Sequence, residues 1–156
     1  MSKQNREVLA DWMIVVGGLM LFASLFLTWS HQFSRPFLTE FGTTDLLHGV
    51  PHDPTAWQVY SSMDVVLALV AVGLVSISML GARRDRIVAA GASAVALIFT
   101  FNALSNPPTS GANIFNPAYS VPHYASPGAT AGAGETLAIL ALLIALGGLA
   151  LSFSAD

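Results

Sequence analysis

Two acids at the openings of long apolar runs are the residues best placed to do chemistry. Asp64 stands in SSMDVVLALV and Glu135 in GETLAILALLIALGG. Ser61, three residues before Asp64, completes a capping-box pattern, in which a hydroxyl and a carboxylate bind the free amides of a helix start. A carboxylate there also faces the positive end of the helix dipole. With Asp85 and Asp11 near two further starts, the pattern favours helix capping.

A shared proton or cation is the alternative role for these acids. Asp64 and Glu135 open two helices that run in the same direction, so both carboxylates are expected at the same outer depth. If the two helices are neighbours, the carboxylates can share a proton or bind a cation. Asn102 is the one amide inside an apolar run and is the third candidate for this ion or proton site, although an interhelical hydrogen bond is its ordinary use.

Metal or haem binding is the chemistry suggested by the histidines, all of which fall between the apolar runs. His48 and His52 are four residues apart, but Gly49 and Pro51 prevent the helix that would align their rings. A metal site there would need a specific turn, and whether any cofactor is bound stays open. The candidate ligands are His31, His48, His52, Asp53 and His123.

Other catalytic chemistry has no support in the spacing of residues. The chain has no cysteine, which excludes disulfides, thiol redox chemistry and thiolate metal sites. Nothing matches a nucleophile elbow, a phosphate-binding glycine loop or a zinc-protease helix. The basic turn Arg83-Arg84-Asp85-Arg86 is explained by membrane topology, so nucleic-acid binding is not expected. We expect a protein that is not an enzyme.

The elements that must position these residues are membrane-spanning helices. The chain of 156 residues is 54% hydrophobic and 10% charged, and four stretches of 18 residues carry no charge. At about 1.5 Å per residue each stretch covers about 27 Å, close to the hydrocarbon thickness of a bilayer. All eight prolines lie outside these stretches. The charge-free stretches are 12–29, 65–82, 87–104 and 136–153.

We therefore predict an all-α membrane protein, a four-helix transmembrane bundle that forms one domain over residues 1–156. The predicted spans cover about residues 11–30, 64–82, 87–105 and 135–153, and the outer loops about 31–61 and 106–133. Lys3, Arg6, Arg83, Arg84 and Arg86 fall on one side and Arg35 on the other. This distribution predicts cytoplasmic termini and a multi-pass protein of the cell membrane.

Aromatic and small residues predict how the spans sit and pack. Trp12, Trp29, Trp57 and Tyr60 are expected to anchor the helices at the lipid headgroups. Small residues allow helices to approach closely in lipid, so Gly17-Gly18, Gly73 and Gly147-Gly148 predict packing patches. The third span begins AAGASAVA, which predicts a central position for that helix. The uncharged, proline-ordered second outer loop is expected to pack on the bundle, on the first outer loop or on a neighbouring subunit.

Three stretches together resemble small four-span proteins common in actinobacterial genomes. They are LTWS at 27–30, AWQVYSSMD at 56–64 and GARR at 81–84. The resemblance implies a bacterial cytoplasmic membrane and transfers no activity. The layout is also similar to the claudin-type tetraspan arrangement, by architecture alone, since the paired loop cysteines of that family are missing here.

Three functions follow as hypotheses. The first is a non-catalytic subunit or scaffold in the lipid bilayer that packs with other membrane-protein subunits or with copies of itself, because the outer loops are too apolar for free solvent. The second is a small ion channel or transporter that uses the outer carboxylates. The third is a membrane protein that binds a metal or haem through its outer histidines.

Overall fold

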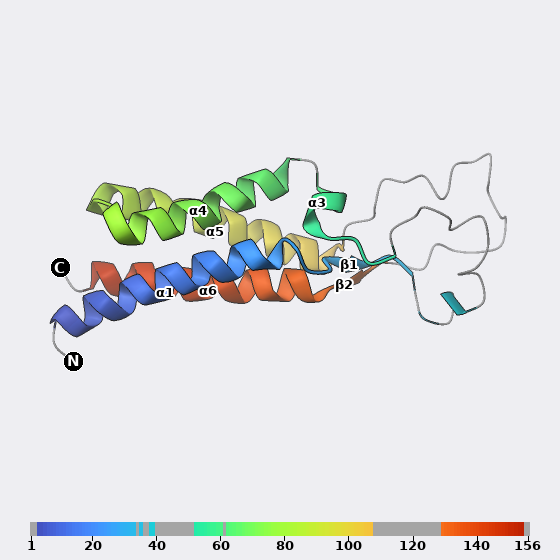
Figure 1. The fold of residues 1–156 in the computed structure, drawn as a ribbon, viewed down its shortest axis with the longest axis horizontal. Helices are drawn as coiled ribbons and strands as arrows, with labels where there is room; N and C mark the ends of the chain where they lie inside the picture. Colours follow the sequence, from blue (N-terminus) through green and yellow to red (C-terminus); the bar gives the residue numbers. More distant parts are fainter. Residues whose placement is uncertain are drawn as a thin grey trace.

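The structure is a computed structural model that describes residues 3–33, 35, 38–39, 52–60, 62–107 and 129–154. Four helices are long and apolar enough to cross a membrane (Figure 1): α1 (Lys3–Ser24), α4 (Met63–Leu80), α5 (Arg83–Ser105) and α6 (Ala133–Phe153). A short helix, α3 (Ala56–Val59), and two short strands, β1 (Ser30–His31) and β2 (Thr130–Ala131), complete the described elements. The all-α four-helix prediction is confirmed, and the chain is a multi-pass membrane protein.

The helices form a ring in which each packs on two neighbours. α1 packs most extensively on α6 and next on α4, while α5 packs on α6 and α4. The order around the bundle is therefore α1, α6, α5, α4, and α4 lies diagonally opposite α6. The start of α1 and the end of α6 lie at one end of the bundle, called here the termini end (Figure 1). The opposite end, where α1 stops and α6 begins, is the loop end.

Glycines bring α1 and α6 into close contact. A Cβ atom on Gly17 would lie 2.7 Å from the Ala141 carbonyl oxygen, and one on Gly148 would lie 2.8 Å from the Ala10 carbonyl oxygen. Two of the predicted packing patches are thus used inside the bundle. The third is not, because a Cβ on Gly73 would meet no atom within 4 Å.

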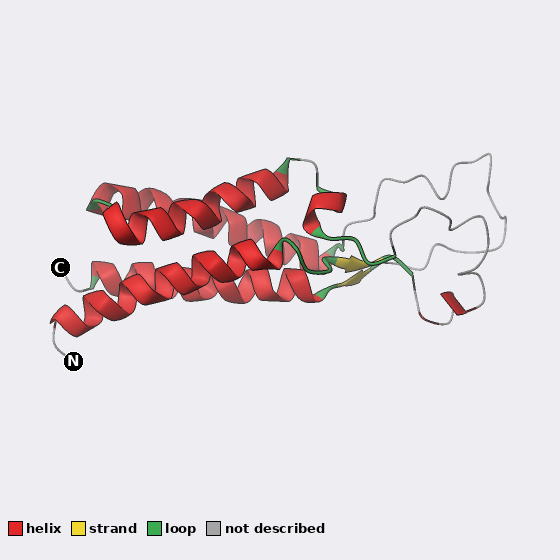
Figure 2. Ribbon diagram, viewed as in Figure 1, coloured by secondary structure: helices red, strands yellow, loops and turns green. Residues whose placement is uncertain are grey.

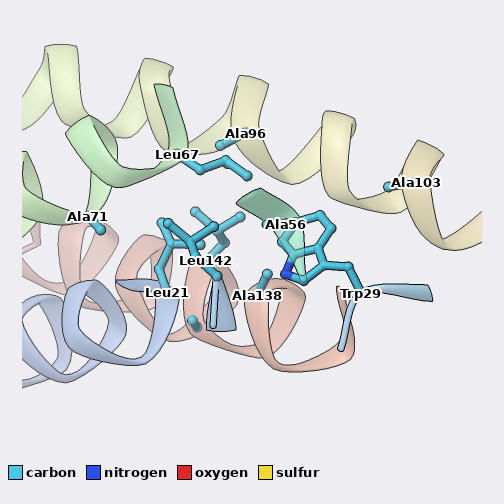
Figure 3. Close-up of a cluster of buried hydrophobic side chains, with 11 residues drawn as sticks. Leu21, Trp29, Ala56, Leu67, Ala71, Ala96, Ala103, Ala138 and Leu142 are labelled. Carbon is cyan, nitrogen blue, oxygen red and sulfur yellow. The ribbon is translucent and has the colours of Figure 1, made fainter. Parts of the chain in front are cut away.

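The prediction that the third span is central is wrong. α6 has the largest buried share of the four helices, while α5 leaves Val95 and Ile98 exposed. Small residues all round α5 permit a close approach on any side, but it is between α1 and α6 that glycines are used for close contact. The core cluster of the loop-end half (Figure 3) consists of Leu21, Leu25, Trp29, Ala56, Leu67, Ala71, Ala96, Ala103, Ala138, Ala141 and Leu142.

The first helix is shifted relative to its charge-free run. It begins at Lys3 and ends at Ser24, so the polar first turns extend it toward the termini end. At its other end Leu25, Phe26 and Leu27 donate backbone hydrogen bonds to carbonyls three residues back, the tighter geometry that commonly ends a helix. Thr28 to Gln32 then run as extended chain, although part of this stretch was predicted to be helical.

That extended stretch joins both outer loops at their bases (Figure 2). On one side Trp29 N–H donates to Pro54 O and Gln32 N–H to His52 O, each at 2.9 Å, and Thr28 bridges Thr55. On the other side β1 pairs antiparallel with β2, with Ser30 opposite Ala131. Residues 28–32, 52–55 and 130–134 are called here the loop-end junction. The predicted contact between the second outer loop and the first is present at these bases.

Candidate functional site

Glu135 lies in the first turn of α6, immediately after the loop-end junction. Its side chain is fully buried, and both carboxylate oxygens lack a hydrogen-bond partner among the described residues. The Gly132 amide faces this carboxylate, but it donates its proton to the Trp29 carbonyl at 2.9 Å. Glu135 is therefore an acid inside the bundle without the capping bond that the sequence pattern favours.

Trp29 forms the wall beside the start of α6. Its indole Nε1–H donates to the Ser24 carbonyl oxygen at 2.8 Å, which uses the one polar atom of the ring. Gly134 allows the ring to sit there, since a Cβ at this position would lie 2.4 Å from Trp29 Cδ1. A side chain at residue 134 would displace the indole, so the glycine and the tryptophan are fitted to each other.

Tyr60 links this wall to α5. Its ring meets Trp29 edge to face at a centroid distance of 5.7 Å and Phe99 at 5.1 Å. Burial raises the pKa of Tyr60 to about 12, and the Glu135 carboxylate adds to the rise. Tyr60 and Glu135 therefore share one electrostatic environment at the loop end.

Asp64 is the second buried acid at this end. Its side chain is 2% exposed and its Oδ1 atom has no hydrogen-bond partner among the described residues. α4 begins at Met63 with Ser62 as N-cap, and Ser62 makes no side-chain capping bond. The structure thus starts the helix one residue later than the predicted capping box requires, and Ser61 lies outside the described residues.

The other two helix-start acids behave differently. Asp85 caps α5, since its Oδ2 accepts a hydrogen bond from the Ala82 amide at 2.9 Å. Asp11 lies within α1, well past its first turn, and its Oδ1 accepts from Arg86 at 3.1 Å. Capping therefore explains Asp85, whereas Asp64 and Glu135 are buried in the interior.

The two buried acids lie at the same end of the bundle but on diagonally opposite helices. Each precedes by three residues a member of the loop-end core cluster, Leu67 for Asp64 and Ala138 for Glu135. The condition under which a shared proton was expected, neighbouring helices, is not met by the packing order. Asn102 does not join them, because it is exposed and its Oδ1 accepts from Asn106 on the same side of α5 at 3.3 Å.

The histidines are divided between separate places. His31 Nδ1 and Asp53 Oδ1 lie 2.6 Å apart on the exposed face of the loop-end junction. The His52 ring instead packs edge to face on Phe33. His48 and His123 lie outside the described residues. Within the described part of the chain, no group of three or more His, Asp or Glu side chains is arranged to hold a metal.

The aromatic residues predicted as interface anchors fall into two groups. Trp12 is 63% exposed, and Trp57 is also exposed and packs on Phe26 at a centroid distance of 6.0 Å. Trp29 is instead fully buried, and Tyr60 is half-buried beside it. The sequence pattern of an aromatic at a span end does not distinguish a ring in the lipid headgroups from a ring in the core.

A charged cavity at the termini end was not anticipated from the sequence. Its volume is about 260 Å³, and the Asp11–Arg86 ion pair forms part of its wall. The acid spacing in REVLAD at 6–11 was the available signal, because residues four apart share a helix face. The lining residues are Glu7, Asp11, Gly81, Arg83, Arg86, Ser152 and Phe153.

Comparison of the chain with protein-family models, with curated proteins and with solved structures finds no match. The resemblance to actinobacterial four-span proteins stays a prediction.

Proposed function

We propose that this chain is a non-catalytic subunit or scaffold of a membrane assembly, formed with other membrane proteins or with copies of itself. The observation that supports it is an open groove between α4 and α5, of about 260 Å³ and lined by apolar side chains and one glycine. The lining residues are Val66, Leu69, Val70, Gly73, Leu74, Ile77, Val88, Ala89 and Ala92.

Gly73 makes this groove suited to a helix from another chain. Helices in lipid associate through close backbone approach at small residues, because lipid tails are as apolar as leucine and supply no hydrophobic drive. Gly17 and Gly148 serve this purpose inside the bundle, whereas Gly73 has no neighbour within 4 Å of a Cβ position. A glycine on an apolar face without a partner from its own chain is the feature that a second helix would use.

The proposed setting is a bacterial cell membrane with both termini in the cytoplasm. Five of the six basic residues of the chain lie at the termini end, which fits the positive-inside rule. The loop-end junction and its two outer loops would then face outward, where they offer a further contact surface.

The decisive experiment is the mass and composition of the particle extracted from native membranes in a mild detergent. We expect a particle larger than one chain, with reproducible companion chains or several copies of this one. Gly73→Leu should fill the groove and release the single chain. Gly91→Leu is the matched control, because a Cβ on Gly91 also meets nothing within 4 Å and Gly91 does not line the groove. A single chain recovered from wild-type membranes would contradict the proposal.

A further inference from the structure

We propose that the Glu135 carboxyl is a proton-binding site: it carries H⁺ at the loop end of the bundle. This site is independent of the proposed function and adds a ligand, the proton, that a scaffold does not require.

The Glu135 carboxyl is isolated from hydrogen-bond donors in the described part of the chain. Both Glu135 oxygens are buried without a partner among the described residues. Two donors beside the start of α6 are already engaged: Gly132 N–H donates to Trp29 O, and Trp29 Nε1–H donates to Ser24 O. A buried ionised carboxylate with no donor is costly, while the protonated acid is neutral. Binding a proton removes this cost.

Among the described residues, no cation lies where it could neutralise Glu135 in place of a proton. Lys3, Arg6, Arg83, Arg84 and Arg86 lie at the termini end, a helix length away. At the loop end Arg35 is exposed, His31 is paired with Asp53, and His52 packs on Phe33. Within the described residues, no basic side chain is placed to form an ion pair with Glu135.

Titratable and aromatic side chains from several elements surround Glu135. Tyr60, after α3, is the titratable group whose ionisation Glu135 opposes, and Asp64 on α4 is the other buried acid that the described residues place at this end. The junction contributes Trp29, and α5 contributes Phe99 beside Tyr60. Metal cations prefer several oxygen ligands, whereas these walls are largely aromatic. Rings and a lone carboxyl fit a proton better than a metal ion.

The test uses dicyclohexylcarbodiimide, an apolar reagent, on the full chain reconstituted in liposomes. The carboxyl proton moves to one carbodiimide nitrogen and the carboxylate oxygen bonds to the central carbon, so that one C=N bond becomes single. The resulting O-acylisourea rearranges to an N-acylurea that mass spectrometry locates in a peptide. We expect this adduct at Glu135, with a yield that falls as pH rises and is unchanged by Na⁺.

Glu135→Gln should abolish that adduct, whereas Glu7→Gln, at an exposed position of α1, should leave it intact. Infrared spectra supply a second readout: a carbonyl band of a protonated carboxyl that is present in the wild type and missing in Glu135→Gln should persist above the pH at which exposed carboxyls ionise and disappear as the pH is raised further. No adduct and no such band in folded wild type would overturn the proposal. Protection from labelling by Na⁺ at constant pH would also overturn it, because the site would then bind a metal cation.

Discussion

The indole nitrogen of Trp29 donates a hydrogen bond to the carbonyl oxygen of Ser24 at 2.8 Å, five residues back along the chain. The Ser24 carbonyl belongs to the last turn of α1, where it also accepts a hydrogen bond from the Leu27 amide at 3.2 Å. Trp29 therefore closes the end of α1 with its side chain while its backbone begins the loop-end junction.

Trp29→Phe should lower the free energy of unfolding by about 1–3 kcal/mol, because the buried Ser24 carbonyl loses the indole donor and keeps only the longer Leu27 bond, and because the smaller ring leaves a void. The measurement is reversible unfolding in mixed detergent micelles. Trp12→Phe is the matched control, since Trp12 is 63% exposed, and it should change stability by less than about 0.5 kcal/mol. Equal effects of the two substitutions would contradict the assignment of Trp29 to the core.

Gly17→Ala should destabilise the bundle by about 1–3 kcal/mol, because the added methyl group would meet the Ala141 backbone at 2.7 Å and force α1 away from α6. Gly91→Ala makes the same change on α5, where nothing lies within 4 Å. Alanine favours helix over glycine by about 1 kcal/mol, so this control should be neutral or stabilising. The same unfolding assay checks both variants, and a stabilising Gly17→Ala would show that α1 and α6 are not in close contact.

Tyrosine ionisation should extend well above the ordinary range in the folded protein. The pKa of Tyr60 is raised from 10.0 to about 12, so the fold favours the neutral phenol. Its contribution to stability is complete below pH 10 and is lost as the pH rises through about 12. Near-ultraviolet absorbance should show a late tyrosinate component that Tyr60→Phe removes. Tyr124→Phe, outside the described residues, is the comparison variant, and complete ionisation near pH 10 would contradict the shift.

The absence of cysteine makes the membrane orientation directly testable. Asp53→Cys places a thiol at the exposed loop-end junction, and Ser154→Cys places one at the exposed termini end. An impermeant maleimide added to intact cells should label the first and reach the second only after lysis. The reverse result would place the termini outside, against the distribution of basic residues.

The number and type of the helices could be predicted because the signal is long and physical. Eighteen residues without a charge or a proline have few alternatives to a spanning helix. The bounds were less predictable: residues 3–7 are polar yet helical, and Thr28 and Trp29 are uncharged yet extended. The absence of charge indicates which residues can lie in lipid, whereas backbone hydrogen bonding decides which residues are helical.

The ion or proton site was predicted as three positions, Asp64, Glu135 and Asn102, without the residues that surround them. Asp64 and Glu135 were identified by their place at helix starts. Trp29, which packs against Gly134 at the start of α6, is far from Glu135 in the sequence. A capping acid and an interior acid share the same local pattern, as Asp85 and Glu135 show. The difference lies in what packs over the helix start, and that information is tertiary.

The pairing of α1 with α6 has a consequence for biosynthesis. α1 is synthesised before α4, α5 and α6, yet α6 is its main partner, so the glycine face toward α6 must stay unpaired in the membrane while α4 and α5 are made. The loop-end junction is subject to the same delay, because β1 cannot gain its β2 partner until residues 130–131 have been synthesised. The contacts of α1 with α6 and of β1 with β2 therefore form last. A nascent chain that stops before α6 exposes the face that a membrane chaperone or protease would recognise.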